Sequence, residues 1–296
     1  MGLIDNSYFR SNFFRKALMM KKIYYFVLAS ALFLGACNGN DSDNSDTTTT
    51  ANTNNGEPTA IPYSVINVYP HDTAAYTEGL FFHDGDLYES TGGMQTPESP
   101  SKSFIVKRTI QDLKPIKQMD LQKGIFGEGI NIINGKLYQL TYTEHKVFVY
   151  DAKTWAKVGE FNWPREGWAM TNDGKSLIIS TGDSNLYYVN PNDFSVEKIV
   201  GVTTNMGPLG NINELEYVDG MVYANVFGQN QIVKIDPNSG KVVGVLDLTD
   251  INAKNGIKYS PKDAGNDVLN GIAYNPTTKT FFVTGKRWPK IFEIRL

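Results

Sequence analysis

Five segments of the chain repeat one pattern of polar and apolar positions. Each starts with an acidic or amide residue, runs through a short apolar stretch, breaks at a turn, and resumes with a second apolar stretch. Several turns are D-G or N-G pairs, as at 84–85 and 134–135, and these residues tolerate the positive φ of tight hairpin turns. The pattern predicts five β-hairpins. Their first residues, here called head residues, are Glu78, Glu128, Glu166, the pair Asn213 and Glu214, and Asn270.

A second pair of apolar stretches follows the hairpins, as in 146–161 and 231–248. A unit of four antiparallel strands is the blade of a β-propeller. Residues 61–296 shared among five units give about 47 residues per unit, which matches the usual blade length of roughly 40 to 50. We therefore expect an all-β fold, a five-bladed β-propeller. A β-sandwich is the rival fold, but five matched units favour the propeller.

The fifth unit is one strand short. After Lys286, residues 289–296 supply only one further strand. The apolar alternation of residues 62–69 can supply the missing outer strand, so blade five should be closed by strands from both ends of the domain. Such a closure removes the exposed strand edges that an open sheet would present.

The N-terminal part of the chain has a different character. Lys21 and Lys22 precede the apolar run 23–34, which is too short for a comfortable transmembrane helix, and L-G-A-C follows at 34–37. We expect residues 1–36 to be a signal peptide ending at a bacterial lipobox, with lipid attached to Cys37. The alternatives are an ordinary secretory signal with an incidental cysteine, and a true start at Met19 or Met20.

Residues 37–60 are rich in Asn, Asp, Thr and Gly and have few apolar positions, so they are expected to be a flexible tether. The propeller domain would then span 61–296. These features predict an exported, lipid-anchored protein of the bacterial cell envelope, on the periplasmic or the surface side, and we expect it to be a monomer.

The amino-acid composition argues against several kinds of site and partner. Cys37 is the only cysteine, which excludes an intrachain disulfide and a cysteine-based metal site. The three histidines are scattered without a metal-ligand spacing, which argues against a zinc hydrolase of the usual kind, although acidic ligands could contribute; our expectation is a protein with no metal and no other cofactor. The formal charge of -3 argues against a nucleic-acid partner, which usually needs a basic face.

The head residues should converge at one mouth of the propeller, because the first strand of each blade lines its centre. Converging carboxylates repel one another, and burial raises the pKa of a carboxyl group further. Such a cluster is suited to proton transfer near neutral pH. The alternative is structural, since a repeated polar head residue can simply hydrogen-bond the neighbouring blade.

Aromatic side chains and one cation are expected at the same mouth. The second strands of the hairpins end near Tyr142, Phe227 and Lys286, and Tyr76 and Trp168 flank head residues. Aromatic walls with a few polar groups suit a small polar ligand, although aromatic residues on strands also form core. Lys286 is not part of the repeat, and a lysine near the acidic head residues would be paired and could stabilise developing negative charge.

Several motifs together resemble one family, the plant-type glutaminyl-peptide cyclotransferases, or glutaminyl cyclases, which also occur in bacteria. The motifs are Y-T-E-G-L at 76, Y-E-S-T-G at 88, F-G-E-G at 126, W-P-R-E-G-W at 163, N-E-L-E-Y at 213, A-N-V-F at 224, N-D-V-L-N-G-I-A at 266 and V-T-G-K-R-W-P-K-I-F-E-I at 283. The resemblance covers nearly all of 61–296. It implies a five-bladed propeller that converts N-terminal glutaminyl residues of peptides or proteins to pyroglutamyl, releasing ammonia, without catalytic zinc.

The resemblance also implies roles for individual residues. The catalytic glutamate of the family falls on Glu128, its functional asparagine on Asn213, and its lysine on Lys286. Substrate contacts fall on the aromatic residues and on two further head residues, which gives the set Tyr76, Glu78, Tyr142, Trp168, Phe227 and Asn270. The chain departs from the plant pattern, which has phenylalanine, glutamine, tryptophan and tryptophan in place of Tyr76, Glu78, Tyr142 and Phe227.

Two other functions remain open from the residues themselves. One is a non-catalytic propeller lipoprotein that binds peptide or glycan. The other is a calcium-dependent hydrolase of the lactonase kind, which also places Glu, Asn and Asp residues at the centre of a propeller.

Overall fold

The structure is a computed structural model, and it describes residues 56–97, 101–109 and 111–296. The predicted signal peptide, Cys37 and most of the predicted tether lie outside the described residues. Within this part of the chain the only helix is α2 (Ile251–Lys254), and no helix is long and apolar enough to cross a membrane.

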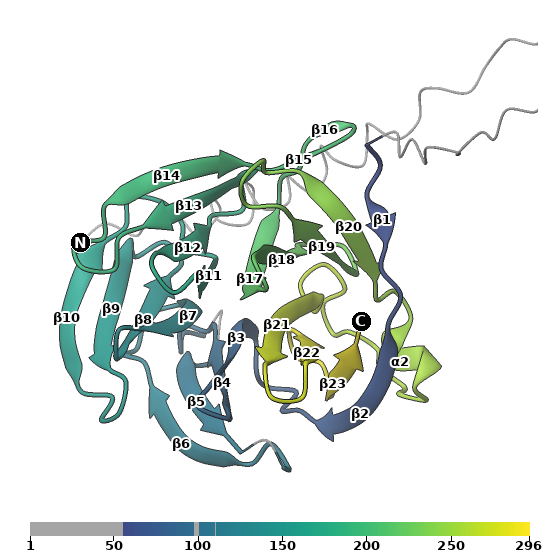
Figure 1. Cartoon of the computed structure of the whole chain (residues 1–296). Helices are drawn as coiled ribbons and strands as arrows, with labels where there is room; N and C mark the ends of the chain where they lie inside the picture. Colours follow the sequence, from purple (N-terminus) through teal and green to yellow (C-terminus); the bar gives the residue numbers. More distant parts are fainter. Residues whose placement is uncertain (1–55, 98–100, 110) are drawn as a thin grey trace, which may run out of the picture. The chain divides into compact units, whose positions relative to one another are not determined.

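Five antiparallel sheets surround a common centre (Figure 1). Blades 1 to 3 each consist of four strands that follow one another in sequence. Blade 1 contains β3 (Thr77–His83), β4 (Asp86–Thr91), β5 (Phe104–Arg108) and β6 (Pro115–Asp120). Blade 2 contains β7 (Gly127–Ile133), β8 (Lys136–Thr141), β9 (Lys146–Asp151) and β10 (Lys157–Asn162), and blade 3 contains β11 (Ala169–Asn172), β12 (Leu177–Ser180), β13 (Asn185–Val189) and β14 (Val196–Gly201).

Blades 4 and 5 complete the ring, and the prediction of an all-β, five-bladed propeller is confirmed. Blade 4 contains β17 (Ile212–Val218), β18 (Met221–Val226), β19 (Gln231–Ile235) and β20 (Val242–Asp247), and blade 5 contains β21 (Leu269–Asn275), β22 (Thr280–Gly285), β23 (Lys290–Arg295) and β2 (Ser64–Pro70). A small hairpin, β15 (Thr203–Thr204) and β16 (Gly207–Pro208), lies between blades 3 and 4 in the sequence.

The ring is closed as predicted, by strands from both ends of the domain. β2 pairs antiparallel with β23, and Val68 lies opposite Phe292. One feature was not expected: β1 (Thr59–Ala60) pairs in parallel with β20 at the outer edge of blade 4. Regular pairing thus begins at residue 59, two residues inside the segment predicted to be a tether, because Thr59 and Ala60 find partners in Gly244 and Val245.

The core consists of apolar layers between neighbouring blades. Each of the five blade-to-blade interfaces has its own cluster of buried side chains, such as Leu80 and Leu87 of blade 1 against Phe282 and Ile291 of blade 5. The inner strands β3, β7, β11, β17 and β21 contact one another around the centre. Alternation along the strands therefore buries both faces of each sheet, which suits a ring of packed sheets.

Four of the inner strands carry an irregularity at their head residue. The pairing register shifts between Thr77 and Gly79, between Gly127 and Ile130, and at the corresponding places in β17 and β21. A β-bulge of this kind re-aims a side chain, and bulges are frequent beside functional sites. The bulges turn the head residues toward one end of the ring, here called the near mouth.

Candidate functional site

Lys286 and Glu78 form a buried ion pair at the near mouth. Glu78 comes from the bulge of β3, and Lys286 directly follows β22 of blade 5. The ammonium lies 2.8 Å from Oε1 and 2.7 Å from Oε2 of Glu78, and both side chains are almost fully buried. Burial alone would lower the pKa of Lys286, but the Glu78 carboxylate and the Tyr76 phenol outweigh it and hold that pKa above its ordinary value. Lys286 therefore stays protonated and keeps Glu78 as its counter-ion.

Glu128 occupies the equivalent bulge of β7 and has no cationic partner among the described residues. Its side chain is 5% exposed, and its backbone carbonyl accepts hydrogen bonds from Ser90 Oγ and from Gln139 Nε2, the latter at 2.8 Å. Burial and the neighbouring Glu78 charge raise the pKa of Glu128 well above the ordinary carboxyl value, against the attraction of Lys286. A hydrogen bond between the two carboxyl groups opposes the effect of burial on the pKa of Glu78. Burial and the Glu78 charge thus favour the protonated form of Glu128, whereas the Lys286 ammonium favours the ionised form of Glu78.

Aromatic rings form the wall around this carboxyl pair. The Lys286 ammonium lies 4.5 Å from the centre of the Tyr76 ring and 5.2 Å from that of Phe227. Phe227 in turn packs edge-on against Trp168, with ring centres 5.8 Å apart. Tyr76, Phe227, Trp168 and Tyr142 are each only partly buried, so they present surface to the near mouth rather than to a blade interface.

Two wall residues were missed by the sequence analysis. Phe126 lies between Tyr76 and Tyr142, with ring centres 6.1 Å and 5.8 Å away. Arg287 stacks on the Tyr76 ring, with its guanidinium carbon 4.5 Å from the ring centre, while Asp267 holds its Nη1 at 2.5 Å. Arg287 directly follows Lys286 in V-T-G-K-R, and Phe126 lies two positions before Glu128 in F-G-E-G, so these motifs are the signal that could have identified them.

Two asparagine amides complete the near mouth. Asn270 is fully buried, and its Nδ2 donates to the Thr77 carbonyl at 2.9 Å and to Glu78 Oε2 at 3.4 Å. The side chain of Asn213, 2% exposed, makes no hydrogen bond with any described residue. Its Oδ1 is buried without a partner among the described residues, and because such an acceptor is normally paired, it indicates a place for a ligand donor.

The structure corrects the prediction for two head residues. Glu166 lies three residues before β11, and Trp168 occupies the head position of blade 3, because Ala169 pairs with Ser180 as Gly79 pairs with Ser90. Glu166 instead accepts the Trp168 indole N–H at 3.0 Å. The sequence analysis missed this because Glu166 and Gly167 form an E-G pair like those at Glu78 and Glu128, but the pair stands two residues before the true head position.

Glu214 was grouped with Asn213 as a head residue but points elsewhere. Its two carboxylate oxygens accept the backbone N–H groups of Leu80 at 3.1 Å and Ile272 at 2.7 Å. Glu214 therefore joins blade 4 to blades 1 and 5 at the centre of the ring, which is the structural alternative considered for the head residues.

The near mouth can hold a polar ligand between a proton-holding carboxyl, an ammonium and a free amide. Within the described ranges, no three His, Cys, Asp or Glu side chains gather in a way that could hold a metal ion.

Comparisons with known proteins identify the family of the chain. Residues 41–296 match the glutamine cyclotransferase family. Over 234 residues the chain is 34% identical to the glutaminyl-peptide cyclotransferase of Arabidopsis thaliana, covering 78% of this chain and 70% of the plant protein. The crystal structure of Myxococcus xanthus glutaminyl cyclase superposes with a TM-score of 0.71 at 33% identity, covering 81% of this chain and 98% of that one.

Proposed function

The chain belongs to the glutamine cyclotransferase family, and we propose that it converts N-terminal glutaminyl residues of peptides to pyroglutamyl residues with release of ammonia. The observation that carries the proposal is the asymmetric carboxyl pair. Glu78 is bound to Lys286, whereas Glu128 is buried beside it without a cation. One carboxyl of the pair is thereby free to take up and return a proton at the mouth where the aromatic wall would hold a substrate.

The reaction joins the substrate's α-amino nitrogen to its own side-chain carboxamide carbon and breaks the bond from that carbon to the amide nitrogen. In this mechanism ionised Glu128 removes a proton from the attacking amine and then donates it to the departing ammonia, so no net proton is consumed. An N-terminal amine titrates at about 7.7 to 8.0. The raised pKa of Glu128 brings its acidity closer to that of the amine, which favours proton transfer in both directions.

Lys286 and Asn213 would bind the carboxamide oxygen as it becomes negative. An ammonium has three N–H donors, and the two contacts with Glu78 leave one available. Asn213 would donate from Nδ2, while its buried Oδ1, which has no partner among the described residues, could accept an N–H of the substrate. The rings of Tyr76, Trp168 and Phe227 would fold the glutaminyl side chain toward a five-membered ring, which lowers the entropic cost of the attack.

A direct test uses purified protein and a short peptide that begins with glutamine. We expect the peptide to lose the mass of one ammonia molecule, with ammonia appearing in solution in equal amount. The matched control is the same peptide with its N-terminus acetylated, which cannot cyclise in this way. Peptide binding without ammonia release would support the non-catalytic alternative, and loss of activity in EDTA would support the calcium-dependent hydrolase.

We further propose that the protein is exported and anchored to a bacterial membrane by lipid on Cys37. The support is the position of the only cysteine at the end of L-G-A-C, after a short apolar run. Expressed in a bacterium, the protein should partition into detergent, and Cys37→Ser should release it into the aqueous phase. Equal partitioning of the two proteins would contradict the anchor.

A further inference from the structure

The inner strands also enclose a cavity at the end opposite the near mouth. This cavity, here called the far cup, has a volume of about 310 Å³ and takes at least one lining residue from every inner strand. These include Phe81, Asn131, Thr171, Glu216 and Tyr274, from β3, β7, β11, β17 and β21. Since Glu216 lies three residues beyond Asn213 on β17, the far cup is on the order of 10 Å along the strand from the catalytic groups.

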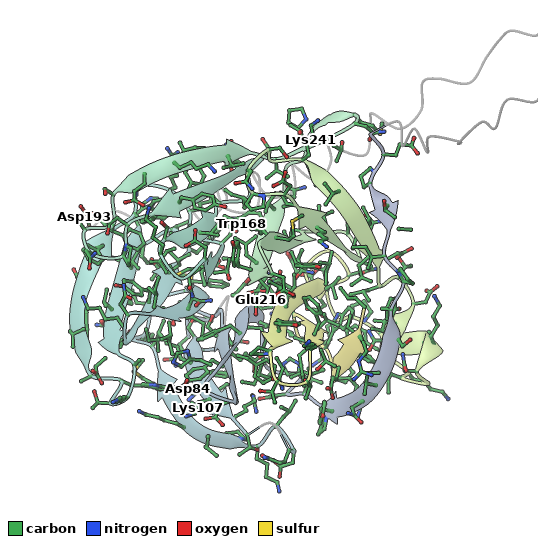
Figure 2. All side chains as sticks on the ribbon, viewed as in Figure 1. Asp84, Lys107, Trp168, Asp193, Glu216 and Lys241 are labelled. Atoms are coloured by element: carbon green, nitrogen blue, oxygen red, sulfur yellow. The ribbon has the colours of Figure 1, made fainter. Side chains whose placement is uncertain are left out.

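Glu216 is the unusual group of the far cup. Figure 2 shows it near the centre of the ring, and its side chain is only 7% exposed. Oε1 accepts the backbone N–H of Tyr274 at 2.8 Å, whereas no described residue donates to Oε2. A buried carboxylate normally has a charged partner or several donors, because leaving water is costly. Glu216 thus lines the cavity with one of its two carboxylate oxygens unpaired.

The charge of the far cup is one-sided. Asp219, exposed in the turn after β17, is a second carboxylate of the lining, and no lysine or arginine lines the cavity. Neither Glu216 nor Asp219 takes part in an ion pair with a described residue. Together with burial, the charge of Asp219 raises the pKa of Tyr274, so this tyrosine is under the influence of the second carboxylate.

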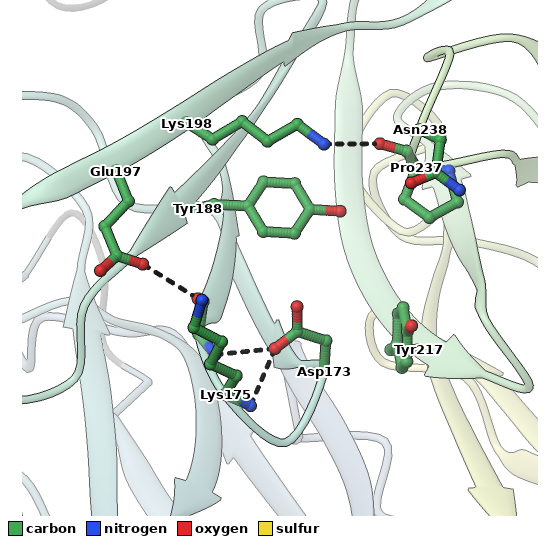
Figure 3. Close-up of a pocket in the computed structure, with 9 residues that line it drawn as sticks. Asp173, Lys175, Tyr188, Glu197, Lys198, Tyr217, Pro237 and Asn238 are labelled. Carbon is green, nitrogen blue, oxygen red and sulfur yellow. Dashed lines mark hydrogen bonds between the residues drawn. The ribbon is translucent and has the colours of Figure 1, made fainter.

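A second cleft on the molecule provides a contrast. It has a volume of about 510 Å³ and lies between blades 3 and 4 (Figure 3). Its acids Asp173 and Glu197 are matched in number by Lys175 and Lys198. Glu197 accepts from Ser176, Asp173 accepts two backbone N–H groups, and Lys198 donates to a backbone carbonyl. This cleft has as many lysines as acids, and both of its acids accept hydrogen bonds, whereas the far cup has carboxylates and no lysine or arginine.

We propose that the far cup is a binding site for a small organic diammonium ion, with one ammonium on Glu216 and the other at Asp219. A carboxylate can accept the ammonium N–H groups, and the partly buried ring of Tyr274, which lines the cavity, can stabilise a cation or cover the hydrocarbon between two cations. This site does not depend on the proposed reaction, because it lies at the opposite end of the inner strands.

Binding should depend on pH in a definite direction. Burial raises the pKa of Glu216 to about 8, and an alkylammonium titrates at about 10.4, as a lysine does. Between these values Glu216 is ionised while the ligand is still charged, so affinity should rise as the pH passes through about 8. The other titratable groups near Glu216 are Glu214, Asp219, Tyr217 and Tyr274. Of these, Glu214 is held by two backbone donors, and burial together with the Asp219 charge raises the pKa of Tyr274.

The test is calorimetric titration of the protein with butane-1,4-diamine at one pH below 8 and one above. We expect saturable binding that is tighter at the higher pH, and a roughly tenfold or greater loss of affinity in Glu216→Gln, equivalent to about 1.4 kcal/mol. The amide oxygen that this substitution introduces can still accept the Tyr274 N–H. Because Asp219 is exposed, Asp219→Asn should fold normally and bind more weakly than wild type.

Two control variants locate the binding. Glu197→Gln changes the balanced cleft, and Glu128→Gln changes the near mouth, which is also acidic; both should bind the diamine as the wild type does. Absence of saturable binding to the wild type would overturn the proposal. So would unchanged affinity in both Glu216→Gln and Asp219→Asn, or a loss of binding in Glu128→Gln.

Discussion

The surroundings of Glu78 and Glu128 separate two otherwise equivalent residues. Both occupy the bulge of an inner strand and both are followed by glycine. Both oxygens of Glu78 contact the Lys286 ammonium, whereas Glu128 is buried beside the negative charge of the Glu78 carboxylate. Two carboxyl groups whose environments differ in this way divide the roles of fixed charge and proton carrier between them. Contact geometry therefore supports the choice of Glu128, which the repeat alone left undecided.

The first prediction concerns Glu128→Gln, which keeps the shape of the side chain but removes its proton transfer. We expect ammonia release from a glutaminyl peptide to fall by about 10² to 10⁴-fold with unchanged thermal stability. The matched variant is Glu166→Gln, whose amide oxygen can still accept the Trp168 indole N–H. It should retain most of the turnover, with any loss in KM. Equal losses in the two variants would show that Glu128 has no special role.

The second prediction concerns the pH dependence of kcat/KM. Burial and the Glu78 charge raise the pKa of Glu128, so activity should fall as the pH drops through that raised value. Glu78→Gln removes a negative neighbour and frees Lys286 to stabilise ionised Glu128. The pKa of Glu128 should therefore decrease, and the acid limb of the pH profile should move to lower pH. Glu144→Gln, which removes a weaker negative influence on the same carboxyl, should move the limb in the same direction by less. A limb that stays in place in both variants would mean that another group titrates there.

At the scale of single elements, the seam between blades 5 and 1 rests on a buried polar network. Glu89 of β4 accepts from His71 Nε2 and Thr77 Oγ1, both at 2.8 Å, and from two nitrogens of Arg108. His71 also contacts the Trp288 carbonyl of blade 5 at 2.7 Å. Burial would raise the pKa of Glu89, but His71 and Arg108 lower it to about 2. The carboxylate thus ties the segment between β2 and β3 to both blades.

The third prediction tests this network through the free energy of unfolding. Glu89→Gln leaves the buried Arg108 without its counter-ion, which typically costs about 3–5 kcal/mol. The stabilisation by Glu89 should be fully present above the ordinary carboxyl pKa and should be lost as the pH falls toward about 2. Denaturant titration at neutral pH measures the difference. The control is Glu160→Gln, which breaks the exposed pairs with Lys146 and Lys157 and should leave the free energy of unfolding nearly unchanged.

The sequence predicted those elements whose signals are local. Hairpin turns such as Asp84–Gly85 and the alternating strands are written in consecutive residues, so the blades and the closing strand were predicted close to their observed bounds. The bulges were not predicted, because the E-G pair does not mark them reliably. The pair lies in a bulge at Glu128, but at Glu166 it lies before the strand begins. The ion pair of Glu78 with Lys286 joins residues 208 positions apart, and only its proximity was expected. The Glu89 network and the clamp by Glu214 depend on how blades meet, which periodicity does not encode.

At the scale of the whole molecule, the ring is held at its centre and at its seam. Glu214 binds backbone groups of blades 1 and 5 from blade 4, so three blades meet on one carboxyl group. At the seam, β2 pairs with β23, and its Tyr69 ring stacks on Phe282. The near mouth and the far cup both lie along the inner strands that this closure fixes. The geometry of the near mouth is therefore a property of the closed ring and not of any single blade.

The fourth prediction tests whether folding depends on the closing strand β2 or only on the length of the N-terminal segment, by comparing two N-terminal truncations. A protein that starts at Tyr63 lacks β1 but keeps β2, whereas one that starts at His71 lacks both strands. The longer protein should unfold cooperatively on heating, because β1 contributes only a two-residue pairing with β20. The shorter protein exposes the edge of β23 and leaves the buried Glu293 without its donors Asn67 and Tyr69. An exposed strand edge favours association between chains, so we expect aggregation and no cooperative transition, measured by circular dichroism and size-exclusion chromatography. A cooperative, monomeric His71 truncation would mean that the other four interfaces suffice to hold the ring.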